Sequence, residues 1–400
     1  MYSKRILVRA EPFCGTGLIS FHIYYAEHIC AYLSFTGSII GSTLNIFNII
    51  VFTRKSMISP INLIFANLAF VDLAGIVAYM PRKWHEFVRL LMYSVKDHRV
   101  YEWETVSLYS WHITSIFHGI SIWFTIMLAV WRYIAIAHPL KEREWCSMKN
   151  TRIFLSAGYV AFPLIWIPAY FDFRVREIET LLDADGFLTS NKTIGIPTTI
   201  YKMQANSKLN NVSRTLSMIL YGIIMKVVPT VVLSVYSYKL IVALLRAKKR
   251  RKELTATMYE RTNSTNTKQK QSADRTTKML LVVLVLFFIS EMPHGICCIL
   301  SIIFGYKFMA GCYAYLFEIF NTVTLFCMSA NFLIYYIMSQ QFRNTFNQLF
   351  SCKSTPAQRK PAFTVAENRV PYDASTRSSI TTLNSTRSSS ITTISSSDII

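Results

Sequence analysis

Several ionisable or hydrogen-bonding side chains lie inside long apolar stretches of this 400-residue sequence. Asp72 and Glu291 carry carboxyl groups there, and Ser121 and Asn331 carry a hydroxyl and an amide. An isolated charge in hydrocarbon costs at least ~2.5 kcal/mol on insertion scales, so such a carboxyl group must be protonated, paired or turned into the interior of a helix bundle. These residues therefore mark where the chain could bind an ion or a ligand.

The stretches around them are those of a membrane protein. Apolar residues make up 52% of the chain and charged residues 16%, and the mean hydropathy is +0.32. A bilayer core of about 30 Å needs about 20 mostly apolar helical residues for each crossing. The sequence predicts an all-α membrane protein, a seven-transmembrane helix bundle, with crossings near 29–53, 61–81, 105–137, 152–171, 215–245, 278–304 and 312–338.

The distribution of charge predicts the orientation. The formal net charge is +20. The segment 246–278 carries 11 Lys and Arg against 3 acidic residues, whereas 172–214 carries 6 against 5. Because cytoplasmic loops hold the basic excess, we expect a multi-pass plasma-membrane protein with an extracellular N-terminus and a cytoplasmic C-terminus. The basic charge is then expected to meet anionic membrane lipid, and no nucleic-acid partner is predicted.

Four segments are expected along the chain. Residues 1–28 form an extracellular tail, 29–338 the seven-transmembrane domain, 339–350 an amphipathic eighth helix, and 351–400 a disordered cytoplasmic tail. Sixteen of the 23 residues of the tail from Ser375 to Ser397 are Ser or Thr. This composition predicts either plain low complexity or a platform that receptor kinases phosphorylate and arrestin then binds.

Several residues are candidates for covalent modification. Asn191 and Asn211 begin glycosylation sequons on the expected outer side, and Cys352 follows the eighth helix as a palmitoylation site or an unmodified thiol. Cys14 and Cys312 face the oxidising side, where they form one disulfide or stay as two free thiols. No metal-ligand spacing is visible, and no catalytic Ser/Lys or paired-Asp spacing indicates a membrane enzyme.

Short motifs occur in a fixed order on these crossings. Together they resemble the motifs of rhodopsin-like (class A) G-protein-coupled receptors over about 29–350. The motifs are Trp131-Arg132-Tyr133, Asn67-Leu68-Ala69-Phe70-Val71-Asp72, Asn331-Phe332-Leu333-Ile334-Tyr335, Pro229 and Pro293. With Lys141-Glu142-Arg143-Glu144-Trp145-Cys146 they are similar to invertebrate myosuppressin and FMRFamide-like neuropeptide receptors, and a nematode member is the specific prediction.

The resemblance implies two internal sites. A G-protein switch would use Arg132, Tyr133 and Tyr335 to meet a heterotrimeric G protein; the alternative for Arg132 is an arginine that snorkels to the interface. A sodium- and water-filled pocket would use Asn45, Asp72, Ser121 and Asn331, with a bound sodium ion and no other cofactor. Ordinary hydrogen bonding between helices is the alternative for the pocket.

Several residues depart from the family pattern. Trp131 stands in place of the acid beside the switch arginine, so the usual ion pair next to Arg132 cannot form. Glu291 replaces the usual tryptophan of the sixth crossing, and Ser107 replaces the cysteine of the third. The segment 171–214 has no cysteine either, so both ends of the family's usual disulfide are missing together.

The ligand class follows from what the crossings lack. The seventh crossing has no lysine for a retinal Schiff base, and Thr114 stands where amine receptors have an aspartate. An extracellular peptide fits better, and an amidated FMRFamide-like or myosuppressin-like neuropeptide is predicted. The alternative is a nematode chemosensory receptor for small molecules. The ligand pocket is expected to include Arg82, Thr114, His118, Glu291, His294, Glu318 and Asn321.

Glu291 needs a partner at its own depth. At 1.5 Å per residue it lies roughly 20 Å above Lys278, and His118 lies about 21 Å above Arg132. Both lower residues are expected at the inner surface, so we predict a hydrogen bond between His118 and Glu291 in the resting state. A ligand arginine could then compete for Glu291. A protonated Glu291 bonded to a backbone carbonyl is the alternative.

Overall fold

The structure is a computed structural model that describes residues 14–21, 26–92, 100–182, 195–205, 216, 219–257, 265–305 and 308–350. The chain divides into a compact unit, Met1–Ser351, and a second unit, Cys352–Ile400, which lies outside the described residues. The predictions for the cytoplasmic tail, Cys352, Asn191 and Asn211 therefore fall outside the described part of the chain.

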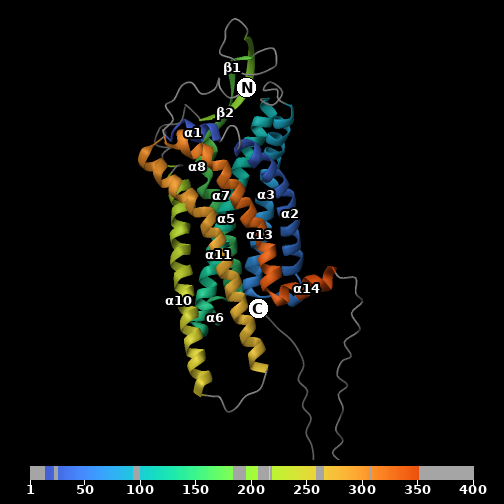
Figure 1. Ribbon diagram of the computed structural model, residues 1–400, viewed down its shortest axis with the longest axis vertical. Coiled ribbons are helices and arrows are strands. Elements are labelled where there is room, and N and C mark those ends of the chain that lie inside the picture. Colours follow the sequence, from blue (N-terminus) through green and yellow to red (C-terminus); the bar gives the residue numbers. More distant parts are fainter. Residues whose placement is uncertain are drawn as a thin grey trace, which may run out of the picture. The chain divides into compact units, whose positions relative to one another are not determined.

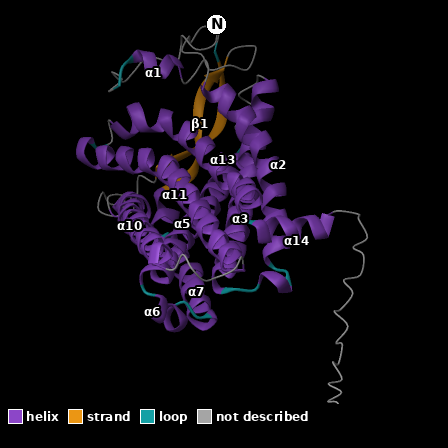
Figure 2. Ribbon diagram, turned by 60° about the horizontal axis from the view of Figure 1, so that its bottom comes forward, coloured by secondary structure: helices purple, strands orange, loops and turns teal. Residues whose placement is uncertain are grey.

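Seven long helical segments pack side by side within the described residues of the first unit (Figures 1 and 2). They are α2 (Glu27–Phe52), α3 (Pro60–Met92), α5 (Tyr101–Ala137), α7 (Met148–Ile165) continued by α8 (Ile167–Asp172), the π-helix η4 (Leu220–Val227) continued by α10 (Val228–Thr257), α11 (Thr265–Phe304), and the π-helix η5 (Met309–Tyr313) continued by α13 (Ala314–Met338). Short helices join them at η3 (Lys55–Met57) and α6 (Pro139–Trp145), and α1 (Thr16–Phe21) precedes them.

The prediction of a seven-helix membrane bundle is confirmed. Among the described residues, six helices are long and apolar enough to cross a membrane, and α11 contributes a shorter apolar stretch, Phe288–Phe304. Large apolar side chains such as Ile40, Leu245 and Ile303 remain more than half exposed. A bundle surface with exposed apolar side chains is suited to contact with lipid rather than with water. Buried polar residues such as Asp72 and Asn45 lie inside.

Close packing between α5 and α7 depends on a glycine. A Cβ atom added at Gly158 would lie 2.6 Å from Cδ1 of Trp123, closer than carbon atoms can approach. The Trp123 ring is held there because its Nε1 donates a hydrogen bond to the carbonyl of Phe154 at 3.0 Å. Small residues allow membrane helices to approach in this way.

The eighth helix, α14 (Gln340–Phe350), lies across one end of the bundle (Figure 1). Phe342 is fully buried, and its ring contacts the rings of Phe52 and Tyr335 at centroid distances of 5.1 and 5.9 Å. The amphipathic eighth helix expected from the sequence is thus anchored to α2 and α13 through the ring of Phe342.

A β-hairpin covers the opposite end of the bundle (Figures 1 and 2). Strands β1 (Phe173–Leu182) and β2 (Ile196–Ala205) pair antiparallel, in a register that sets Phe173 opposite Ala205 and Leu182 opposite Ile196. From the sequence alone a long loop is expected here, because the segment lies between the crossings that end near 171 and begin near 215. We call the two ends of the bundle the hairpin end and the α14 end.

Non-covalent contacts hold the hairpin to α5, where the family's usual disulfide is missing. The amide of Met203 donates to a carboxylate oxygen of Glu104 at 3.2 Å. The rings of Tyr101 and Tyr201 meet edge to face at 5.6 Å, and those of Trp111 and Phe173 do so at 5.3 Å.

Candidate functional site

The α14 end carries the predicted switch residues. Tyr335 is buried beneath α14, and the Tyr133 ring lies 5.9 Å from that of Tyr236 on α10. Arg132 is partly buried, and its Nε has no hydrogen-bond partner among the described residues.

Trp131, which replaces the family's acid, has a structural role. Its Nε1 donates to Oγ1 of Thr151 at 3.1 Å, which ties α5 to α7. The thiol of Cys146, in the turn after α6, lies 3.9 Å from the carbonyl oxygen of Trp131. Burial there raises the pKa of the Cys146 thiol to about 11.

Asp72 stands at the centre of a polar network near the middle of the bundle. Ser121 Oγ donates to one carboxylate oxygen at 2.6 Å, and Asn331 Nδ2 donates to the other at 3.3 Å. Asn45 Nδ2 donates to the carbonyl of Gly41 at 3.0 Å, and its Oδ1 has no partner among the described residues. The structure thus brings Asp72, Ser121 and Asn331 together and places Asn45 separately on α2.

Glu291 is paired with a residue that the sequence analysis missed. Lys226 Nζ, from η4, donates to Glu291 Oε2 at 2.8 Å and lies 2.9 Å from His118 Nε2. His118 Nε2 is itself 3.1 Å from Glu291 Oε1. The expected pair of His118 and Glu291 is therefore a triad that joins three helices. The cation that pairs with Glu291 in the structure is therefore Lys226 of the receptor itself, whereas the sequence predicted that an arginine of the ligand could pair with Glu291.

Two of the cavities within the described part of the bundle meet at His118, which lines both. The upper cavity, nearer the hairpin, has a volume of about 80 Å³ and is lined by Tyr79, Arg82, Trp111, Thr114, His118, Tyr221, Lys226, Phe317 and Asn321, among others. The lower cavity, of about 40 Å³, is lined by Asp72, His118, Ser121, Ser290, Glu291, Thr324 and Asn331, among others. The upper cavity opens between aromatic rings, and the lower one joins the Asp72 network to the triad.

A cluster of charges stands beside the upper cavity. Arg82 donates to Glu318 at 2.7 Å and to Glu86 at 3.1 Å, and Lys83 is bound by the same two carboxylates. Lys83 is only 1% exposed, and the carboxylates of Glu86 and Glu318 compensate its buried charge. We call these four residues the rim cluster; it carries no net charge.

The predicted ligand residues lie in four places. Arg82, Thr114, His118 and Asn321 line the upper cavity. Glu318 belongs to the rim cluster, and Glu291 lines the lower cavity. His294 is buried, 3.1 Å from the hydroxyl of Tyr313. Of these seven residues, Glu291, His294 and Glu318 thus lie outside the upper cavity lining.

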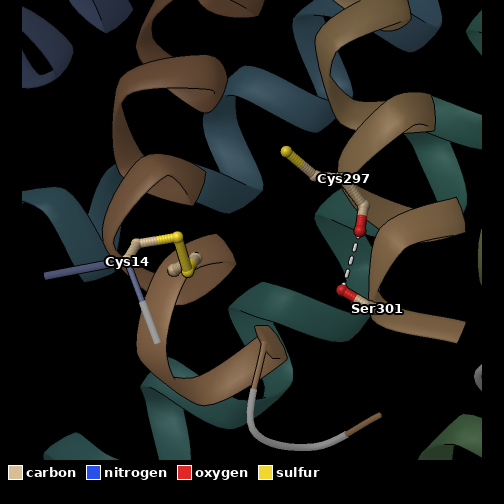
Figure 3. The surroundings of a disulfide bond; sticks show 4 residues. Cys14, Cys297 and Ser301 are labelled. Atoms are coloured by element: carbon tan, nitrogen blue, oxygen red, sulfur yellow. Dashed lines mark hydrogen bonds between the residues drawn. A yellow bond between two sulfur atoms is a disulfide. The ribbon is translucent and has the colours of Figure 1, made fainter. Parts of the chain in front are cut away.

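Cys14 and Cys312 form a disulfide at the hairpin end (Figure 3). Their Cα atoms are 5.6 Å apart, so the bond ties the segment before α1 to η5. Cys297 and Ser301 of α11 lie nearby, where Ser301 Oγ donates to the carbonyl of Cys297 at 2.7 Å. Of the two alternatives for these cysteines, the structure has the bridged one.

Comparisons with known proteins agree with this architecture. Squid rhodopsin superposes with a TM-score of 0.59 at 17% identity, covering 86% of this chain and 92% of its own. The G-protein coupled receptor dmsr-1 of Caenorhabditis elegans is 26% identical over 88% of this chain and 75% of its own length. The FMRFamide receptor of Drosophila melanogaster is 24% identical over 80% of this chain and 54% of its own length.

The fold and the ordered motifs define a rhodopsin-like G-protein-coupled receptor, as the sequence predicted. A family model matches residues 32–353, most of the chain. The chain belongs to this family, which is described as the serpentine type 7TM GPCR chemoreceptor Srw.

Proposed function

We propose that this receptor binds an extracellular neuropeptide, of the amidated FMRFamide-like or myosuppressin-like kind, and activates a heterotrimeric G protein. The observation that carries the proposal is the upper cavity, which is lined by aromatic rings and hydrogen-bond donors beneath a hairpin. Its volume of about 80 Å³ admits one end of a peptide, whereas pockets for whole drug-sized ligands measure about 300–1,000 Å³.

Relatives support a peptide ligand. The FMRFamide receptor and the sex peptide receptor of Drosophila melanogaster are named for peptides, and the latter is 25% identical over 76% of this chain. The N-terminus would face outward and the C-terminus the cytoplasm at the plasma membrane. The tail would then bind receptor kinases and arrestin, and the basic loop would meet lipid.

Signalling would run from the triad to the α14 end. Ligand binding in the upper cavity would act on Lys226 and through it on Glu291 of α11. Pro293, two residues further on, lies inside this helix, and a kink at a proline would make the helix the movable element. Movement of α11 would open the α14 end, where Arg132 and Tyr133 would meet the G protein.

A sodium ion at Asp72 forms part of the proposal. The carboxylate, the Ser121 hydroxyl and the Asn331 amide offer the hard oxygen atoms that such an ion prefers. The Oδ1 of Asn45, on α2, has no partner among the described residues and is the further oxygen that the family resemblance would assign to this pocket. These residues fit a small cation with water.

The test is a screen of amidated peptides on cells that express the receptor, with a G-protein readout and Arg132→Ala as the silent control. A small-molecule chemosensory receptor is the second candidate, because the matching family is described as chemoreceptors. Activation by small odorants and not by any peptide, or expression confined to ciliated sensory endings, would favour that second function.

A further inference from the structure

The three groups of the triad do not face the same space. Lys226 lines the upper cavity, Glu291 lines the lower one, and His118 lines both. A ligand that enters from the hairpin end therefore meets the nitrogen atoms first. The carboxylate lies behind them, bonded to Lys226 at 2.8 Å.

The geometry assigns the proton on His118. Its Nε2 lies 2.9 Å from the ammonium of Lys226 and 3.1 Å from Glu291 Oε1, and one ring nitrogen cannot accept from the first and donate to the second at once. The ammonium of Lys226 has no lone pair and can only donate, so the 2.9 Å contact requires Nε2 to be the acceptor. Nε2 therefore accepts from Lys226, and the proton of the neutral ring is on Nδ1.

Two N–H donors are then unused. Nδ1 of His118 is buried and has no partner within the described part of the chain. The ammonium of Lys226 has three N–H bonds, of which Glu291 and His118 take two. A buried donor without an acceptor costs about 1–3 kcal/mol, so this part of the cavity favours a group that supplies an acceptor.

The charges already balance. Lys226 is compensated by Glu291, and the two cations of the rim cluster are compensated by its two carboxylates. A ligand carboxylate would bring a buried anion without a counter-charge, and a ligand guanidinium would add a cation beside two N–H donors. A neutral acceptor satisfies both donors and leaves the balance unchanged.

We infer that the floor of the upper cavity binds the carbonyl oxygen of a neutral terminal carboxamide, through N–H groups of Lys226 and His118. The choice of a peptide terminus rests on the proposed function, whereas the preference for a neutral acceptor rests on the site alone. The walls formed by Trp111, Tyr221 and Phe317 favour an aromatic side chain next to that amide.

Four small probes separate the contributions of the acceptor, the donor and the charge. They are N-acetyl-phenylalaninamide, the methyl ester, the corresponding alcohol and the free acid, each tested for thermal stabilisation of the purified full-length receptor. The amide and the ester keep the carbonyl acceptor and should bind within about threefold of each other. The alcohol keeps only a hydroxyl oxygen, a weaker acceptor than a carbonyl, and adds an O–H donor beside the two N–H donors, whereas the acid adds a charge. Both should bind at least about 10-fold more weakly.

A pair of charge-balanced variants localises the effect. Lys226→Met with Glu291→Gln removes the ammonium without leaving a buried charge, and it should abolish the preference for the amide over the alcohol. Lys83→Met with Glu86→Gln removes another buried lysine, which does not line the cavity, and should preserve the preference. If the first variant does not fold, the order in which the four probes bind the unmodified receptor still tests the inference.

The inference is overturned if the acid binds best, if the ester falls to the level of the alcohol, or if no probe stabilises the receptor up to its solubility limit. Failure of the proposed function looks different. In that case the probes follow the expected order, but no amidated peptide elicits a G-protein signal from cells.

Discussion

The pairing of Lys226 with Glu291 can be measured by a double-mutant cycle. Both side chains are almost fully buried, with exposed fractions of 3% and 2%, and the ion-pair distance is 2.8 Å. Removal of one partner of a buried pair leaves an uncompensated charge, which costs about 3–5 kcal/mol. Lys226→Met and Glu291→Gln should each destabilise the receptor by this amount, because each leaves the other residue charged and alone.

The double variant should recover most of the loss, since a methionine beside a glutamine leaves no charge. At about 2–3 °C for each kcal/mol, the single variants should lower the midpoint of thermal unfolding by roughly 6–15 °C, and the double variant by less than about half of that. The measurement is the fraction of detergent-solubilised receptor that stays monodisperse after heating. Lys239→Met, on the exposed face of α10, is the matched control and should change the midpoint by less than about 2 °C.

Two results would refute the reasoning. If Glu291→Gln is as stable as the unmodified receptor, Glu291 is protonated and carries no charge for Lys226 to compensate. If the double variant loses the sum of the two single losses, the two residues do not interact, whatever their distance.

Four further outcomes are expected. Arg132→Ala should abolish G-protein signalling with ligand binding intact, and normal signalling at matched surface levels would contradict the switch assignment. Truncation after Cys352 should leave agonist potency unchanged and slow arrestin recruitment, which internalisation assays would report. Gly158→Ala should cost about 1–3 kcal/mol of stability in a thermal assay, because the new Cβ meets the Trp123 ring. The raised pKa of Cys146 keeps its thiol protonated at pH 7, so mass spectrometry should find slow alkylation that accelerates as the pH rises towards about 11.

The bundle could be predicted from the sequence because each crossing needs about 20 apolar residues, and such a signal is local. The network around Asp72 followed from motifs whose order on the crossings is shared with the family. Lys226 was missed although a lysine inside an apolar stretch is a strong signal of function. The depths of His118 and Glu291 concern only their own two helices, and a third helix can supply a partner at the same depth.

The hairpin was missed for a different reason. Residues 173–182 form a strand, but the segment was assigned to a loop because no crossing covered it. Its position over the bundle depends on contacts with α5, such as that between Glu104 and Met203, which join residues 99 positions apart. No local pattern in the sequence reveals a pairing at that separation.

The disulfide between Cys14 and Cys312 also has a topological consequence. It joins residues 298 positions apart, so the chain from the first helix of the bundle to the sixth lies within one covalent ring. A single proteolytic cut anywhere in that ring opens it without separating the two pieces. A nicked receptor should therefore migrate as one species on a gel under non-reducing conditions and as two fragments after reduction.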